Sequence, residues 1–347
     1  MKQNLKAVLL VGALLGIGIN LPLSAAPVNK VEQNSGQKRV AKATDRPVAK
    51  SRKTAGKVRS KKLTKAAASK HAATNSVRKP VRHVTMTDMD PGRLALYSAS
   101  ALVIDQNSGQ AIIEKHSDLV VPIASISKLM TAMVVLDANL DLQDVISIGN
   151  EDVDSLKGTR SRLPVGTTMT RETAMLLALM SSENRAAHAL GRHYPGGMPA
   201  FVQAMNRKAL ALGMYNSSFE EPTGLSSNNV STAHDLARMV AAAARYPEIR
   251  RFSTTAEAKL ALNGRISNFG NTNALVRNDN WEIGVSKTGY ISEAGRCLVM
   301  QARVADKPVV IVLLDSNGKM TRVGDANRIK RWMESAGLGS VLARGPA

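Results

Sequence analysis

The chain has 347 residues, of which 44% are hydrophobic and 3% are aromatic. That hydrophobic share is too high for a wholly disordered chain, and the length suffices for one large domain or two small ones. The single cysteine, Cys297, excludes an internal disulfide framework and a cysteine-based zinc cluster. Lys and Arg number 47 against 27 Asp and Glu, a formal net charge of +20, and most of this charge lies in one segment.

Residues 1–25 have the pattern of a secretory signal peptide. Lys2 and Lys6 give a positive start, residues 7–19 form an apolar run, and small residues follow Pro22. The alternative is a membrane anchor, but a spanning helix needs about 20 apolar residues and this run is shorter. We therefore expect cleavage after Ala25 and export to the periplasm, as a protein that is soluble or held peripherally at the membrane.

Residues 26–92 are expected to form a basic disordered arm. Between residues 27 and 85 there are 17 Lys and Arg, two acidic residues and no Phe, Trp, Tyr, Ile or Met. Such a segment cannot bury enough apolar surface to offset its chain entropy. Without aromatic residues it lacks base stacking, and export removes most access to nucleic acid, so we expect no nucleic-acid partner. We expect a polyanion or a membrane surface as its partner; the alternative is a solvated tether with none.

Regular structure is predicted for the domain at residues 93–347. Strands are expected at both ends of this domain and helices in between, which indicates an α+β fold with an antiparallel sheet rather than alternating βαβ units. In chain order, the pattern predicts two strands at 99–105 and 110–115, helices at 125–139, 170–180, 185–193, 199–212 and 232–245, strands at 281–287, 297–304 and 308–314, and a helix that includes 329–334.

The motif Ser125-Ile-Ser-Lys128 opens the first predicted helix. Residues three apart lie on one helical face, so the Lys128 amine can reach the Ser125 hydroxyl. A serine becomes a nucleophile when a base takes its proton, and a lysine is such a base only if burial or a nearby positive charge lowers its pKa. Alone the motif is weak, because residues 35–38 and 76–79 match it by chance.

A second motif, Ser182-Glu183-Asn184, lies between two predicted helices. Its hydroxyl could relay a proton, and its amide could hold a substrate carbonyl. Residues 226–228 and 227–229 match the same pattern, so capping of a helix break is the alternative for this motif taken alone.

A third motif, Lys287-Thr288-Gly289, ends a predicted strand and occurs once. A cation beside a hydroxyl suits a substrate carboxylate, and a glycine lets another backbone approach closely. Taken alone, a charged strand end on a solvated face is the alternative. Cys297, within the next predicted strand, is expected to pack rather than react.

The order of these motifs is that of penicillin-binding proteins and class A β-lactamases. The sequence resembles the serine D,D-peptidases of bacterial cell-wall metabolism, the low-molecular-mass penicillin-binding proteins of peptidase family S11. Within them it is similar to the type-seven D-alanyl-D-alanine endopeptidases. The resemblance implies the β-lactamase/D,D-peptidase (transpeptidase-like) fold, an antiparallel sheet with a helical subdomain. It extends over about residues 98–334 and rests on residues 122–133, 179–187, 193–197, 221–226, 231–236, 287–289 and 294–300.

The resemblance also implies catalytic roles. Ser125 would attack the carbonyl of a D-alanyl peptide bond and form an acyl-enzyme, with Lys128 taking its proton. Ser182 would pass the proton to the departing amine. The backbone N–H groups of Ser125 and Tyr290 would form the oxyanion hole. No metal and no cofactor is expected.

Substrate-binding roles follow from the same resemblance. Asn184 would position the substrate, and Lys287, Thr288 and Gly289 would hold its carboxylate. The charge of Lys287 would help to keep Lys128 neutral. Peptidoglycan is the implied substrate, and β-lactams are the implied inhibitors.

The expected activity is that of an endopeptidase on D-alanyl–meso-diaminopimelate cross-links. A D,D-carboxypeptidase is the main alternative, disfavoured because such enzymes commonly continue into a further β-domain and an amphipathic anchor. A class A β-lactamase would use Glu221 to activate water, but residues 222–225 follow the D,D-peptidase pattern, so we expect Glu221 to be a loop residue. An inactive wall-binding protein is a further alternative, which the intact motifs disfavour.

Overall fold

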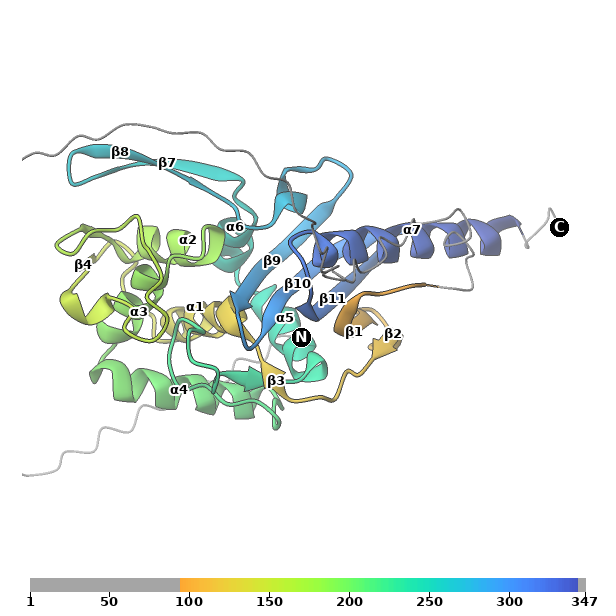
Figure 1. Ribbon diagram of the computed structural model, residues 1–347, viewed down its shortest axis with the longest axis horizontal. Coiled ribbons are helices and arrows are strands. Elements are labelled where there is room, and N and C mark those ends of the chain that lie inside the picture. Colours follow the sequence, from red (N-terminus) through yellow and green to blue (C-terminus); the bar gives the residue numbers. More distant parts are fainter. Residues whose placement is uncertain (1–93, 343–347) are drawn as a thin grey trace, which may run out of the picture. The chain divides into compact units, whose positions relative to one another are not determined.

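The computed structural model describes residues 94–342. Within this part, the central sheet has five antiparallel strands in the order β2-β1-β11-β10-β9 (Figure 1). The pairing of β1 with β11 joins the two ends of the domain, with Leu102 opposite Val312. The strands are β1 (Ser98–Asp105), β2 (Ala111–Lys115), β9 (Glu282–Ile291), β10 (Gly295–Val304) and β11 (Lys307–Ser316).

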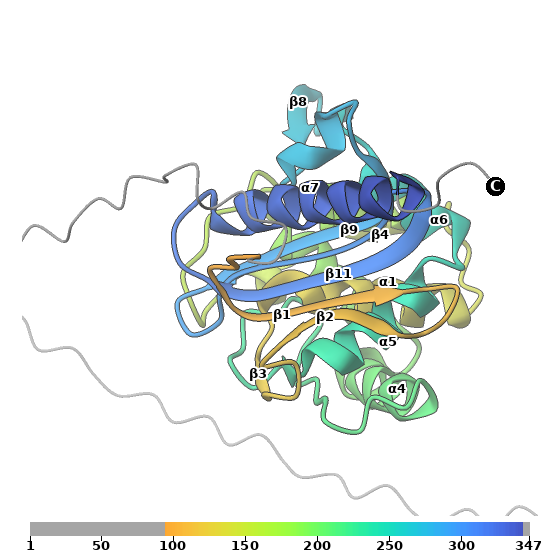
Figure 2. The same cartoon turned by 90° about the vertical axis from the view of Figure 1, so that its right-hand side faces the viewer.

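Both faces of the sheet are covered. Along β11 the side chains alternate: Val310 and Val312 pack toward the helical subdomain, whereas Ile311 and Leu313 pack toward α7 (Thr321–Leu342). Figure 2 shows α7 lying across one face of the sheet, and α5 (Ala233–Ala243) packs against the opposite face. A strand buried on both faces needs apolar residues at successive positions, which is why β10 and β11 read as continuous apolar runs.

The helical subdomain surrounds α1 (Ser127–Asp137), which is buried from Ser127 to Val135. A helix that is buried on all sides belongs at the centre of a core. The start of α2 is fixed by Thr170, whose hydroxyl accepts a hydrogen bond from the backbone N–H of Thr173. The other helices here are α2 (Arg171–Met180), α3 (Asn184–Arg192), α4 (Gly197–Ala211) and α6 (Pro247–Thr254).

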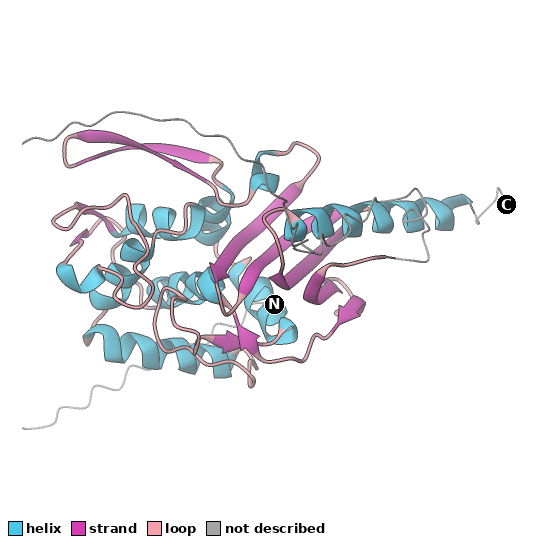
Figure 3. Cartoon of the chain, in the orientation of Figure 1, coloured by secondary structure: helices cyan, strands magenta, loops and turns pink. Residues whose placement is uncertain are grey.

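The predicted α+β fold is confirmed, and so is each predicted strand and helix within a few residues (Figure 3). Two boundaries matter for function. Ser125 lies in a short 3₁₀ turn, Ala124–Ile126, and α1 begins only after it. The Lys-Thr-Gly motif lies inside β9, which continues to Ile291, and not at its end as predicted.

Several elements were not predicted. The largest is the hairpin of β7 (Glu257–Leu262) and β8 (Arg265–Gly270). Its turn, Asn263-Gly264, has positive φ at both residues, and an Asn-Gly pair of this kind is a strong sequence signal for a hairpin. The others include α6 and the short strand pairs β3 (Val121–Pro122) with β6 (Val230–Ser231) and β4 (Val145–Ser147) with β5 (Thr168–Thr170).

The predicted signal peptide and basic arm lie outside the described residues and stay predictions. Within residues 94–342, no helix has both the length and the apolar character needed to cross a bilayer.

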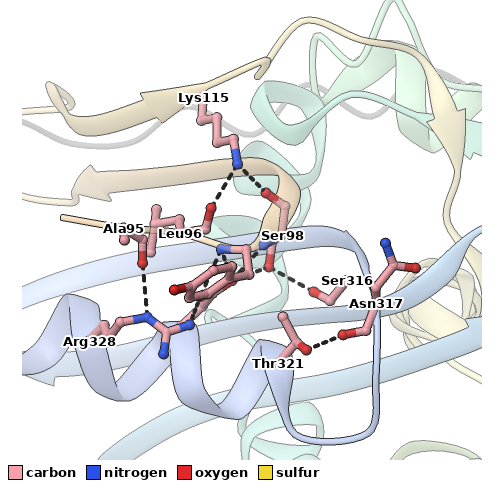
Figure 4. Close-up of polar contacts among 10 residues, drawn as sticks. Ala95, Leu96, Ser98, Lys115, Ser316, Asn317, Thr321 and Arg328 are labelled. Carbon is pink, nitrogen blue, oxygen red and sulfur yellow. Dashed lines mark hydrogen bonds and ion pairs between the residues drawn. The ribbon is translucent and has the colours of Figure 1, made fainter. Parts of the chain in front are cut away.

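A buried carboxylate joins α7 to the beginning of the domain. Asp325 is fully buried, and its Oδ2 accepts hydrogen bonds from the backbone N–H of Ser98 at 2.7 Å and from its hydroxyl at 2.6 Å. Tyr97 N and Arg328 donate to the same carboxylate. Figure 4 shows the surrounding contacts, in which Arg328 Nε donates to Ala95 O at 2.9 Å.

Asp325→Ala should therefore lower the stability of the domain. The change removes the carboxylate that accepts from Arg328 NH2 and from two backbone N–H groups, and breaking a buried charge pair costs about 3–5 kcal/mol. We expect a lower Tm and a lower midpoint in urea. The control is Asp279→Ala, which removes an exposed carboxylate. Equal midpoints for the two variants would contradict the anchoring role of Asp325.

Candidate active site

The three sequence motifs meet at one place. The turn at Ala124–Ile126 packs against β9, which carries Lys287, while Ser182 and Asn184 stand at the junction of α2 and α3. Hydrogen bonds connect the motifs: Lys128 reaches Asn184, and Lys287 reaches Ser182. Residues far apart in the chain thus form one polar site between the sheet and the helical subdomain.

Lys128 is at the centre of this site. Its amine lies 2.8 Å from Ser125 Oγ, 2.7 Å from Asn184 Oδ1 and 2.6 Å from the carbonyl oxygen of Thr223. The side chain is fully buried. Lys128 lies three residues after Ser125, and its amine contacts the Ser125 hydroxyl as the sequence predicted.

Burial lowers the pKa of Lys128 from its ordinary value to about 7, although the carboxylates of Glu221 and Glu183 act to raise it. The neutral form of the amine is thus populated near neutral pH. It has two N–H groups and one lone pair. The carbonyl oxygens of Asn184 and Thr223 can only accept, so they take the two N–H groups, and the lone pair is left for the Ser125 hydroxyl. This arrangement can remove the serine proton.

Lys287 is the second buried amine, with 1% of its surface exposed, so the solvated strand end is excluded. Its Nζ donates to Ser182 Oγ at 2.9 Å and to the carbonyl oxygen of Thr288 at 2.9 Å. Burial lowers the pKa of Lys287 well below its ordinary value, and the charges of Lys128 and Arg322 lower it further. Burial is the main cause at both amines, and the expected repulsion between them acts on the pKa of Lys287.

Ser182 has φ of 61°, in the left-handed region that a serine rarely adopts. Such strained residues concentrate at functional sites, where the surrounding structure holds them. Here the hydrogen bond from Lys287 and the backbone hydrogen bond from Glu183 N to Leu177 O hold the turn.

Gly289 makes the close backbone approach that the sequence predicted. A Cβ at this residue would lie 2.9 Å from Ile123 O and 3.1 Å from the backbone nitrogen of Ser125. The strand therefore passes directly beside the nucleophile, and Tyr290 is the next residue along it. Thr288, also buried, donates its hydroxyl hydrogen to Thr272 Oγ1 at 2.6 Å.

The loop at residues 221–225 also contributes to the site, and the sequence assigned it no role. Glu221 accepts hydrogen bonds from Thr223 N and Gly224 N, both at 2.6 Å, which fixes the Thr223 carbonyl against Lys128. These contacts confirm Glu221 as a loop residue, because its carboxylate binds its own loop.

Arg322 is a further residue that the motifs did not indicate. It extends from α7, and its NH1 donates to the carbonyl oxygens of Gly289 at 3.1 Å and Cys297 at 3.2 Å. It thereby supports β9 beside the Lys-Thr-Gly motif. No local sequence pattern distinguishes it from other arginines, because its role depends on a contact across the fold.

Comparison with known proteins shows that this fold is that of the serine D,D-peptidases. Residues 84–318 match the peptidase S11 family, described as D-alanyl-D-alanine carboxypeptidase. The chain belongs to this family. It is 49% identical over 259 residues to a D-alanyl-D-alanine endopeptidase of Pseudomonas aeruginosa, covering 74% of this chain and 84% of that protein. A D-alanyl-D-alanine endopeptidase of Escherichia coli is 49% identical over 248 residues, covering 71% and 80%.

Solved structures show the same fold. The Streptomyces K15 DD-transpeptidase is 26% identical, with a TM-score of 0.65, and the match covers 70% of this chain and 98% of that one. Penicillin-binding protein D2 of Listeria monocytogenes, in a cefotaxime-bound form, is 27% identical with a TM-score of 0.62, covering 69% and 98%. The transpeptidase-like fold expected from the sequence is confirmed.

Proposed function

We propose that this chain is a penicillin-sensitive D-alanyl-D-alanine endopeptidase that hydrolyses D-alanyl–meso-diaminopimelate cross-links of peptidoglycan during cell-wall remodelling. The observation that carries the chemistry is the fully buried Lys128 amine, 2.8 Å from Ser125 Oγ, with two acceptor-only oxygens to take its N–H groups. The choice of bond is supported by the endopeptidase names of the Pseudomonas and Escherichia relatives.

Catalysis proceeds through an acyl-enzyme. Ser125 Oγ attacks the D-alanyl carbonyl carbon as Lys128 takes the hydroxyl proton. The N–H groups of Ser125 and Tyr290 stabilise the oxyanion. As the C–N bond breaks, the proton passes through Ser182 to the departing amine. Water then attacks the ester, releases the D-alanyl carboxylate and returns the proton to Ser125.

The other motif residues hold the substrate. Asn184 positions it with its side-chain amide. Lys287 and Thr288 bind the carboxylate of the departing diaminopimelate, and Gly289 lets β9 lie close to the scissile bond. Because β-lactams resemble the D-alanyl-D-alanine terminus, the same steps acylate Ser125 with penicillin.

Export to the periplasm is part of this proposal, since peptidoglycan lies outside the cytoplasm. It is supported by the basic start and the apolar run of residues 1–25. The basic arm would hold the enzyme near a polyanion or a membrane surface, supported by its 17 Lys and Arg.

The decisive test incubates the purified protein, beside Ser125→Ala, with cross-linked muropeptide dimers and with pentapeptide monomers, and identifies the products by mass. Conversion of dimers to monomers is expected. Loss of one alanine from pentapeptides without dimer cleavage would make the protein a D,D-carboxypeptidase, the alternative that the family description favours. No product from either, with wall binding retained, would indicate an inactive wall-binding protein.

The acylation rate should rise with pH. Lys128 must be neutral to accept the serine proton, and with its pKa lowered to about 7 it is protonated below this value and neutral above it. We expect an acid limb with a midpoint near pH 7, measured as the rate of labelling by a fluorescent penicillin. A flat profile from about pH 5 to about pH 9 would exclude Lys128 as the base.

A further inference from the structure

The middle residue of the Ser-Glu-Asn motif is a buried carboxylate. The Ser-x-Asn pattern places no requirement on this position, yet only 6% of Glu183 is exposed. Its Oε2 accepts a hydrogen bond from Ser161 Oγ at 2.7 Å, and its Oε1 accepts one from Arg162 Nε at 2.9 Å. A carboxylate is buried at a cost unless its oxygens are paired in this way.

Arg162 is in turn attached to the β7–β8 hairpin. Its NH1 donates to the carbonyl oxygen of Asn268 at 3.2 Å, and its guanidinium lies 4.4 Å from the centre of the Phe269 ring. Glu183 therefore connects the loop around residue 162 and the hairpin to the turn between α2 and α3. This is a long-range clamp on two of the site residues, since Glu183 is bonded directly to Ser182 and Asn184.

The clamp acts where the backbone needs support. Ser182 holds the left-handed conformation, and its hydroxyl must stay within reach of Lys287. Asn184 must keep its carbonyl oxygen on the Lys128 amine. Rotation of the Glu183 side chain out of its pocket would release the turn that sets both positions.

The charge of Glu183 also acts on Lys128. Around that amine, the carboxylates of Glu183 and Glu221 favour the protonated form, while burial favours the neutral form. Arg162 forms an ion pair with Glu183 at 2.9 Å and balances its charge. The carboxylate of Glu221 accepts hydrogen bonds within its own loop. Of the two carboxylates that act on Lys128, only Glu183 therefore belongs to the Ser-x-Asn turn.

We propose that Glu183 is a positioning residue, which holds the turn carrying Ser182 and Asn184 in its acylation geometry and whose charge contributes to the pH dependence of the site. This inference rests on the proposed function, because it assigns Glu183 a part in the acylation of Ser125. If so, the central position of the Ser-Glu-Asn motif requires a glutamate in this protein, although the Ser-x-Asn pattern allows any residue there.

The test measures the rate of labelling of the full chain by a fluorescent penicillin between about pH 5 and about pH 9. Glu183→Gln keeps the size of the side chain and removes the charge. We expect acylation about tenfold slower on the plateau, because the turn is less well held, and an acid limb moved to lower pH, because neutral Lys128 is then favoured. Arg162→Met leaves Glu183 unneutralised, so the acid limb should move to higher pH.

A purely structural role of Glu183 would not move the midpoints of the acid limb in opposite directions in the two variants. Glu220→Gln is the matched control: Glu220 is an exposed carboxylate that contacts Ser226 and Asn228, and its removal should change neither rate nor midpoint. Unchanged rates in Glu183→Gln, or slower rates with the midpoints of both variants at the wild-type pH, would overturn the inference. If Glu183→Gln does not fold, Arg162→Met provides the test: a midpoint at higher pH supports the inference, and a midpoint at the wild-type pH or lower overturns it. Failure of the wild-type protein to label would instead overturn the proposed function.

Discussion

Replacing Lys128 with methionine should slow the acylation of Ser125 by a factor of about 10³ or more at every pH. Methionine nearly matches the length of lysine but has no lone pair to accept the hydroxyl proton. It also removes the donor that Asn184 Oδ1 and the Thr223 carbonyl share. The rate of labelling by a fluorescent penicillin measures this effect directly, because it reports the first covalent step alone.

Two further variants show whether proton transfer or charge is lost. Lys128→Arg keeps a cation and several donors but stays protonated at all accessible pH values, so it should be as slow as Lys128→Met. Lys319→Met, at an exposed lysine, is the control for the substitution itself and should label at the wild-type rate. Labelling of Lys128→Met within tenfold of the wild-type rate would show that another group takes the proton.

The sequence allowed the pairing of Ser125 with Lys128 to be predicted because this contact is local. A separation of three residues places two side chains on the same side of a helical turn, and this holds for the 3₁₀ turn that leads into α1 as well. The strands of the sheet could also be predicted, since apolar runs bounded by turn residues have few other interpretations. The family resemblance then related the three motifs to one another, which no periodicity could do.

The parts that escaped prediction depend on contacts across the fold. Glu183 is placed by Arg162 and Arg322 acts on Gly289, and both contacts join segments distant in sequence. The sequence predicts a helix that begins at Ser125, whereas residues 124–126 form a 3₁₀ turn and α1 begins at Ser127. The shape of this turn depends on Ala124, whose φ of 50° lies in the left-handed region. An alanine gives no sign of this by itself.

That turn makes Gly224 a position of large expected effect. Gly224 has φ of +79°, and a Cβ there would lie 1.9 Å from Ala124 O and 2.8 Å from the backbone nitrogen of Ser125. Both neighbouring atoms belong to backbone, so they can yield only if the turn itself moves. In Gly224→Ala the nucleophile and one N–H group of the proposed oxyanion hole should therefore be displaced together.

We expect Gly224→Ala to slow acylation about 100-fold, the effect typical of a displacement near 1 Å in a catalytic site. Gly109→Ala separates this clash from the strain of a positive φ. Gly109 has φ of +72°, but a Cβ there meets nothing within 4 Å, so its replacement should lower Tm without changing the labelling rate. If Gly224→Ala were to label as fast as Gly109→Ala, the turn at Ala124 would be able to move without loss of function. The site would then owe its geometry to the Lys128 hydrogen bonds alone, and not to the close packing of Gly224 against the nucleophile.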